Sequence, residues 1–410
     1  MKIAGITAEY NPLHNGHLYH IAETRRQTGC DAIVVAMSGD FVQRGEPAMI
    51  DKWLRAKHAL KAGADLIVEI PTLFCLGNAS QYASAGVCIL ESLGCSVISF
   101  GSGSGDIKTI SEVAGVLAEN RERIRSYISE KTKEGKSYPA ARMEAYKDIR
   151  SGITSKESLE KELAVLSEPN DILAIEYVSN MERSKPLAIK RQGAYHEDDE
   201  SEQSGYRSAE YIRQIIETES NACGAINKDV PEYVSDSLGI VRPVFPDNCF
   251  EILKFAILST DAETIDKCPS GGEGLGNLIK TTIKEAGNYE ELVLKVKSKR
   301  YTYTRISRLC MQIMLGISRE KYSFDGPEYI RILGHNEKGR ELLAAIRTAS
   351  KDDGSGCLPM ITNINKESKK LNSTALDHLF LDIHASEVYH LISRDDSPEH
   401  AEQRMRPVII

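Results

Sequence analysis

The sequence predicts an α/β protein with an open, mostly parallel sheet, followed by a mostly α-helical C-terminal region. Four short runs rich in Ile and Val have the composition of strands buried on both faces, at residues 3–10, 32–37, 65–70 and 95–100. Between them lie three helical patterns with apolar residues three and four apart, at residues 17–28, 50–62 and 80–93. This alternation predicts parallel βαβ units, whose ligand site lies outside the carboxyl ends of the strands.

The second half of the chain has a different pattern. A further short strand is expected at 187–192, but from about residue 226 helical patterns dominate, at 249–260, 262–267, 274–286, 289–298, 304–317, 338–350 and 373–394. Gly224 and Pro231 mark the change, because Gly and Pro are typical of turns and loops. We therefore expect an α/β domain over residues 1–225 and a helical domain over residues 226–410, ending in a polar, frayed segment at 395–406.

The composition is that of an ordinary globular chain of two to three domains. It has 410 residues, 41% of them hydrophobic and 27% charged, which excludes a disordered or collagen-like protein. The 51 Lys and Arg against 59 Asp and Glu leave a net charge of −8. A nucleic acid partner would therefore need a local basic surface.

The sequence also predicts the compartment. The nine cysteines are odd in number and form no C-x-x-C pair, and no window approaches 18 consecutive apolar residues. We expect reduced thiols, a cytoplasmic location and no membrane partner. The general preference of soluble enzymes for symmetric dimers leaves a homodimer open.

The segment with the most specific chemistry follows the first predicted strand and reads TAEYNPLHNGH, residues 7–17. Pro12 fixes the turn, and Gly16 has no Cβ where a nucleotide would approach. The helix that follows points free N–H groups at an anion, and His14 and His17 can donate hydrogen bonds to phosphate oxygens. The alternative is a helix start with two surface histidines, and the strand, turn and helix context favours the phosphate site.

These residues also carry a resemblance. The H-x-G-H signature after the first strand is similar to that of the nucleotidyltransferase superfamily. The wider runs NPLHNGHLYHI, MSGDFVQRGEPAMIDKWLRAKHAL, GADLIVEIP, SFGS and YTYTRISRL resemble the bacterial tRNA(Met) cytidine acetate ligase family over essentially the full chain. The resemblance implies a Rossmann-like nucleotidyltransferase domain. It also implies an ATP-dependent ligase that activates acetate as acetyl-adenylate and acetylates N4 of the wobble cytidine, position 34, of elongator tRNA(Met), which gives N4-acetylcytidine.

The resemblance also implies site residues. His14 and His17 would be catalytic, ATP would arrive with Mg²⁺, and no protein metal ligands are expected. Asn170 and Arg191 by themselves are typical of a helix N-cap and a surface charge, and only the resemblance makes them nucleotide contacts. The expected ATP contacts are Thr7, Ala8, Glu9, Tyr10, Asn11, Pro12, His14, Gly16, His17, His20, Gly101, Asn170 and Arg191.

Two positions depart from the pattern that the resemblance implies. Gly103 stands where an acidic residue usually follows FGS, and Glu210 stands where a hydroxyl would be expected in a helix-opening element that touches the triphosphate. We assign neither a catalytic role. Arg44 and Lys52 or Arg55, after the second strand, are candidates for phosphate or carboxylate binding, against the alternative that Arg44 pairs with an acidic neighbour on the surface.

The densest basic stretch lies in the helical half and is expected to contact RNA. Cations with interleaved aromatics suit single-stranded RNA, although a charge run is more often a solvated helix face. The predicted RNA contacts are Lys295, Lys297, Lys299, Arg300, Tyr301, Arg305 and Arg308.

Two other functions stay open at this point. One is an adenylyltransferase that acts on a small phosphate-bearing metabolite, which would turn over without RNA. The other is an RNA-binding protein with a disabled nucleotide site, which the departures at Gly103 and Glu210 would suit.

Overall fold

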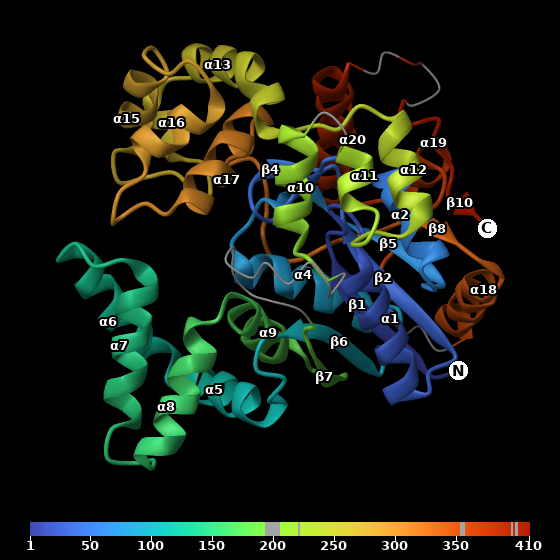
Figure 1. Cartoon of the computed structure of the whole chain (residues 1–410), viewed down its shortest axis with the longest axis horizontal. Helices are drawn as coiled ribbons and strands as arrows, with labels where there is room; N and C mark the ends of the chain where they lie inside the picture. Colours follow the sequence, from blue (N-terminus) through green and yellow to red (C-terminus); the bar gives the residue numbers. More distant parts are fainter. Residues whose placement is uncertain (193–205, 220–221, 353–356, 395–396, 398–400) are drawn as a thin grey trace.

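The computed structural model describes residues 1–192, 206–219, 222–352, 357–394, 397 and 401–410, and is centred on one sheet (Figure 1). The sheet has the order β10-β8-β5-β2-β1-β6-β7, with β9 beside β8. All pairs are parallel except β5 with β8. The predicted strands are β1 (Ile3–Ala8), β2 (Ala32–Ser38), β5 (Leu66–Ile70), β6 (Val97–Ser102) and β7 (Lys185–Lys190). The α/β class with an open, mostly parallel sheet is confirmed.

Both faces of the sheet are buried, as the Ile- and Val-rich strands predicted. In β2, Val34 and Ala36 belong to one hydrophobic core and Val35 and Met37 to the other, because successive side chains point to opposite faces. The predicted crossover helices are α1 (Asn15–Thr28), α2 (Lys52–Lys61) and α4 (Ala79–Ser92). Short elements between them are β3 (Phe41–Val42), β4 (Glu46–Pro47) and α3 (Thr72–Cys75).

Five helices are inserted between β6 and β7. They are α5 (Ile107–Glu119), α6 (Arg121–Lys133), α7 (Tyr138–Arg150), α8 (Lys156–Ser167) and α9 (Pro169–Asn180). The α6–α7 hairpin has a small core of its own, made of Ile124, Ile128, Ala141, Ala145 and Ile149. It projects from the edge of the molecule at the lower left of Figure 1.

Helices dominate the following segment, as predicted. They are α10 (Ala209–Thr218), α11 (Ala222–Ile226), α12 (Glu232–Ile240), the 3₁₀ turn η1 (Pro246–Cys249), α13 (Phe250–Ser259), α14 (Ala262–Asp266), α15 (Leu275–Thr282), α16 (Tyr289–Val296) and α17 (Tyr303–Met314). Helix α17 packs tightly on the β3–β4 turn, where a Cβ on Gly45 would lie 2.3 Å from the backbone N of Arg308. Only glycine fits there.

The chain then returns to the sheet with three more strands, and the sequence did not predict this return. The returning elements are β8 (Ile330–His335), α18 (Glu337–Asp352), β9 (Met360–Ile361), α19 (Ile364–Glu367), η2 (Ser368–Lys370), α20 (Ser373–Ser393) and β10 (Val408–Ile409). The expected division at residue 225 falls inside α11, and three strands from beyond it complete the sheet of the first domain. The expectation of two domains stays a prediction.

The expectation of a frayed segment at 395–406 is wrong for its described part. Glu402 is only 2% exposed, and its carboxylate lies 3.3 Å from Nζ of Lys52 in the interior. Trp53 Nε1 donates to the same carboxylate at 3.2 Å. Two partners on α2 hold this segment in place, and neither could be foreseen from its polar composition.

Candidate active site

The loop after β1 makes a sharp turn that is held by hydrogen bonds to two distant segments. Tyr10 has φ 49°, and the Asn11–Pro12 peptide is cis. The Asn11 side chain accepts from Met49 N at 2.7 Å, and its carbonyl accepts from the guanidinium of Arg213 at 2.8 Å. The loop therefore leaves the carboxyl end of β1 in a fixed direction and enters α1 directly.

His14 and His17 form a reciprocal cap at the start of α1. Nδ1 of His14 accepts from Gly16 N at 3.0 Å, and Nδ1 of His17 accepts from His14 N at 3.2 Å. Because each Nδ1 is an acceptor, each neutral ring carries its proton on Nε2. The two ring centroids are 3.8 Å apart. The sequence spacing thus produces two adjacent N–H donors of defined tautomer.

Gly16 is required for this arrangement. A Cβ at that position would lie 2.7 Å from Cε1 of His14, closer than any real contact. A side chain there would push the His14 ring away from its cap. The glycine of the H-x-G-H pattern therefore leaves room for the His14 ring as well as for a nucleotide.

The histidines are neutral at pH 7. Burial, assisted by the positive charges of Arg191 and Arg213, lowers the pKa of His14 to about 3. Burial also lowers the pKa of His17, and it lowers that of His20 to about 4 with help from Arg191. Positive charge at the site therefore comes from the arginines, while the imidazoles act as neutral hydrogen-bond donors.

Arg191 joins the predicted contacts from β6 and α9 to this group. Its guanidinium donates to Oδ1 of Asn170 at 2.8 Å, and Nδ2 of Asn170 donates to Glu168 at 2.8 Å. A Cβ on Gly101 would lie 3.6 Å from Cγ of Arg191. The structure thus brings Gly101, Asn170 and Arg191 together, and Arg191 lies close enough to the histidines to influence all three.

The remaining predicted contacts support the loop. Glu9 Oε1 accepts from Gln43 N at 2.9 Å. His20 Nε2 is paired with Ser99 Oγ on β6 at 2.9 Å, so its ring fastens α1 to the sheet. Thr7 and Ala8 end β1, and a Cβ on Gly86 of α4 would lie 2.9 Å from Thr7 Oγ1.

The two departures from the expected pattern have local explanations. A Cβ on Gly103 would lie 2.6 Å from Cδ of Glu168, so the carboxylate of Glu168 fills the space beside this glycine. Glu210 forms an ion pair with Arg44 at 2.8 Å. Its charge is therefore compensated by Arg44, which pairs with Glu210 and not with a neighbour in its own loop.

Lys52 and Arg55 are not available to bind a ligand. Lys52 is 1% exposed and pairs with Glu69 at 2.8 Å. Arg55 is fully buried and donates to the carbonyls of Ile50 at 3.0 Å, Glu9 at 2.6 Å and Ser38 at 3.1 Å, and also to that of Gly39. The expectation that either binds phosphate or carboxylate is wrong, but Arg55 ties the loop after β1 to the loop after β2.

We expect Arg55→Lys to loosen the active-site loop. An ammonium cannot reach carbonyls on three segments at once, and each lost charged hydrogen bond is worth about 1.5–3 kcal/mol. The free energy of unfolding should fall by about 2–4 kcal/mol, and the KM for ATP should rise. Urea unfolding and ATP titration measure the two effects. Arg26→Lys, at an exposed arginine of α1 paired with Glu23, is the matched control, and equal behaviour of both variants would contradict the role.

The predicted RNA contacts separate into two groups. Lys295 pairs with Glu291 at 2.7 Å, and Arg300 and Arg305 pair with Glu273 at 3.0 and 3.5 Å. Lys297 and Lys299 are exposed and form no ion pair within the described residues. Tyr301 is buried and Arg308 is partly buried, so only part of the stretch faces solvent.

Tyr301 is buried, and Arg308 is partly buried. Tyr301 is 8% exposed, its hydroxyl donates to the carbonyl of Glu273, and the guanidinium groups of Arg300 and Arg305 lie 5.6 and 5.2 Å from its ring centroid. Its ring therefore has no free face for a base in this structure. Arg308 donates to the Gln43 carbonyl at 3.4 Å, its Nε has no acceptor, and burial lowers its pKa to about 10.

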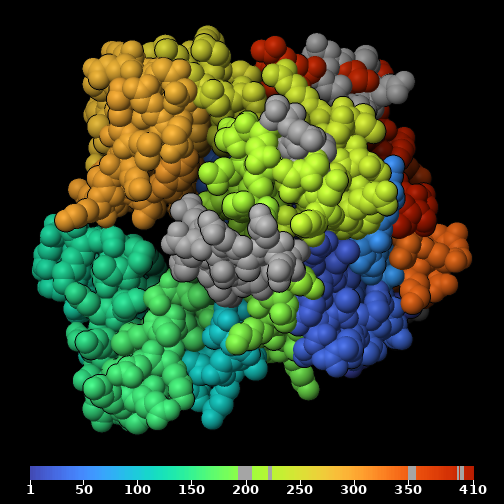
Figure 2. Space-filling view, in the orientation of Figure 1, coloured from blue at the N-terminus to red at the C-terminus, as the bar shows by residue number. Residues whose placement is uncertain are grey.

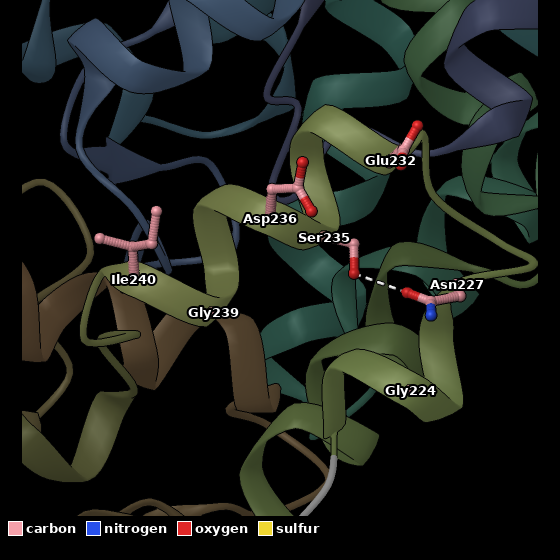
Figure 3. A pocket seen from close by; sticks show the side chains of 7 residues that line it. All are labelled: Gly224, Asn227, Glu232, Ser235, Asp236, Gly239 and Ile240. Carbon is pink, nitrogen blue, oxygen red and sulfur yellow. Dashed lines mark hydrogen bonds between the residues drawn. The ribbon is translucent and has the colours of Figure 1, made fainter.

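A surface pocket of about 810 Å³ lies between α11 and α12 (Figure 3). Glu232 and Asp236 line it, together with Asn227 and Ser235, whose side chains are hydrogen bonded at 2.6 Å. It contains none of the predicted ATP contacts, and its lining has two carboxylates and no Lys or Arg.

The buried neutral histidines predict a pH dependence of stability. His14, with its pKa lowered to about 3, and His58, with its pKa lowered to about 4 by burial, stay neutral when the unfolded chain takes up protons below pH 6.5. Stability should therefore fall as the pH drops, by about 2 kcal/mol per histidine between pH 6.5 and 5. Urea unfolding at pH 7 and 5 measures this. His58→Gln should remove its share of the difference, and an unchanged difference would contradict the assignment.

Among the described residues, no helix combines the length and apolar character needed to cross a membrane.

Comparison with known proteins gives a consistent result. Residues 1–404 match the family model described as HIGH Nucleotidyl Transferase. The chain is 35% identical to the tRNA(Met) cytidine acetate ligase of Acetivibrio thermocellus, with 100% of both chains covered, and 38% identical to that of Clostridium perfringens strain SM101, with 96% of both covered. The crystal structure of Thermotoga maritima TmcAL bound with alpha-thio ATP superposes with a TM-score of 0.89 at 31% identity, covering 100% of both chains.

Proposed function

Because the chain belongs to the HIGH nucleotidyltransferase family and, within it, to the tRNA(Met) cytidine acetate ligases, we propose that it acetylates N4 of the wobble cytidine of elongator tRNA(Met) with ATP and acetate. The observation that carries the proposal is the pair of neutral Nε2–H donors of His14 and His17, beside Arg191, at the carboxyl end of β1. An ATP analogue is bound in the Thermotoga maritima relative.

In the first step an acetate oxygen attacks the α-phosphorus of ATP, and pyrophosphate leaves. Mg²⁺ enters with the nucleotide as part of the substrate. The two Nε2–H groups and the guanidinium of Arg191 stabilise charge that develops on the phosphate oxygens, and the fixed loop holds the reactants in line. Because the imidazoles are preorganised by their own cap, they need no reorganisation during the reaction.

In the second step the cytidine amine attacks the carbonyl carbon of acetyl-adenylate. The C–N bond forms, AMP leaves and the amine releases a proton. The amine is a poor nucleophile, so activation of acetate as an anhydride with AMP suits this acceptor. The wobble base lies in a single-stranded loop, where it can be turned outward without breaking a duplex. We place the protein in the cytoplasm with this substrate.

On the RNA side we propose that exposed cations of the helical region contact the tRNA. Lys297 and Lys299 support this best, because they are exposed and unpaired within the described residues. Lys295, Arg300 and Arg305 pair with Glu291 and Glu273, so they would contact the RNA only if these ion pairs open and a phosphate takes the place of the carboxylate. Tyr301 and Arg308 would serve by supporting this surface.

Nucleoside mass spectrometry of elongator tRNA(Met) tests the proposal directly. We expect an acetyl group on cytidine after incubation with protein, ATP, Mg²⁺ and acetate, and none when acetyl-CoA replaces ATP and acetate. Pyrophosphate release without acetylated tRNA would favour the adenylyltransferase that acts on a metabolite. Binding of RNA with neither product would favour the protein with a disabled nucleotide site.

A further inference from the structure

We propose that the α6–α7 hairpin is a second RNA-binding surface, which contacts the phosphate backbone of the tRNA with Arg121, Arg125 and Lys133 and stacks a base on Tyr138. The inference rests on the proposed function, since it assumes an RNA substrate. It concerns a part of the fold that has no role in the nucleotide site and that lies outside the basic stretch at 295–308.

The charge of the hairpin is opposite to that of the chain. Residues 121–150 contain nine Lys and Arg against five Asp and Glu, a net charge of +4 in a chain of net charge −8. Thirty residues thus carry a local excess of positive charge, which is the electrostatic feature that an acidic protein needs to hold RNA.

Most of this positive charge is not compensated. Lys131, Lys136, Arg142 and Arg150 pair with carboxylates. The other five cations are exposed and form no ion pair within the described residues; they are Arg121, Arg123, Arg125, Lys133 and Lys147.

Three of the unpaired cations follow one ridge of α6. Arg121, Arg125 and Lys133 are spaced by multiples of four, so they lie along a row of side chains that winds slowly around the helix, with Ser129 between Arg125 and Lys133. Arg125 and Lys133 line a shallow hollow of about 450 Å³ together with Glu122, Ser126, Ser129 and Glu130, and Glu130 lies 4.0 Å from the ammonium of Lys131. A stripe of cations with a hydroxyl suits successive phosphates of a backbone.

Tyr138 supplies the exposed aromatic side chain that Tyr301 does not. It is 58% exposed at the first position of α7, directly after the turn that follows Lys133. An exposed tyrosine offers a free face for base stacking. The hairpin thus carries exposed cations and an exposed aromatic side chain, the combination that the sequence predicted at 295–308.

The position of the hairpin allows both surfaces to act on one RNA. The hairpin and the helical region of α13–α17 occupy the same edge of the molecule in Figures 1 and 2. The hairpin has its own core and packs on the body through α5 and α8. Substitutions on its outer face should therefore leave the nucleotide loop undisturbed.

The test combines three substitutions, Arg121→Gln, Arg125→Gln and Lys133→Gln, in the full chain. We expect the dissociation constant for elongator tRNA(Met) to rise about tenfold or more, and the salt dependence of log K to become shallower by about two. The rate of ATP–pyrophosphate exchange with acetate should stay at the wild-type value. Tyr138→Ala should weaken binding about fivefold or more, and Tyr138→Trp should restore it.

The matched control removes three cations from α18, at the opposite edge of Figure 1, as Lys338→Gln, Arg340→Gln and Arg347→Gln. Wild-type affinity and salt slope in this control, with the loss in the hairpin variant, support the proposal. Equal losses in both variants, or no loss in the hairpin variant, overturn it. Failure of the wild-type chain to bind or acetylate the tRNA refutes the proposed function itself, which is a separate result.

Discussion

Replacing His17 with Ala is expected to lower the rate of acetyl-adenylate formation by about 10²- to 10³-fold, the usual cost of losing one preorganised donor. The substitution removes the Nε2–H group and also the Nδ1 acceptor of His14 N, which is 3.2 Å away. The reciprocal cap is then broken, so His14 loses its fixed position as well. ATP–pyrophosphate exchange in the presence of acetate measures this step without RNA.

His384→Ala is the matched control, because His384 is exposed on α20, far along the chain from the loop. It should keep the wild-type exchange rate and unfolding temperature. Exchange within threefold of wild type in His17→Ala would show that the loop does not carry the chemistry. His17→Asn separates the two roles of the ring, since an amide can cap α1 but does not reproduce the position of Nε2.

The site was predictable to the extent that its chemistry lies in one contiguous segment. The strand, turn and helix pattern placed residues 7–17 at the carboxyl end of a parallel strand, and the structure shows His14 and His17 there. Asn170 and Arg191 were predicted only through a resemblance, because they meet only when α9 packs on β6 and β7.

The roles that were missed depend on contacts between distant segments. Arg55 on α2 and Arg213 on α10 donate to carbonyls of the loop after β1, and nothing in their local sequence indicates that they support this loop. For the same reason β8 was missed, since a six-residue strand interrupted by the charged Arg331 has no clear pattern. Tyr301 shows the opposite error: it lies in a basic stretch that is typical of an exposed surface, but its side chain is buried.

Lys52→Met is expected to be the most destabilising single substitution, because Lys52 is the central cation of a buried carboxylate cluster. Its Nζ lies 2.8 Å from Glu69, 3.3 Å from Glu402 and 3.9 Å from Asp40, and all four side chains are at most 3% exposed. Methionine fills similar volume but leaves Glu69 and Asp40 without a cationic partner among the described residues, whereas Glu402 keeps Arg331 at 3.4 Å. Removing one member of such a group costs about 3–5 kcal/mol.

The cluster connects α2, β5 and the segment that holds Glu402, so its loss should also free the C-terminal return to the sheet. Urea unfolding at pH 7 measures the loss, and Lys57→Met, at an exposed position on the same helix, should change stability by less than about 0.5 kcal/mol.

The destabilisation should also depend on pH. Burial already raises the pKa of Glu69 and of Asp382, and removal of Lys52 takes away the positive charge that opposes this rise. The carboxyl groups of the variant should then bind protons more readily than those of the wild type, so the destabilisation should shrink between pH 7 and pH 5. An unchanged loss at both pH values would show that the effect comes from packing and not from uncompensated charge.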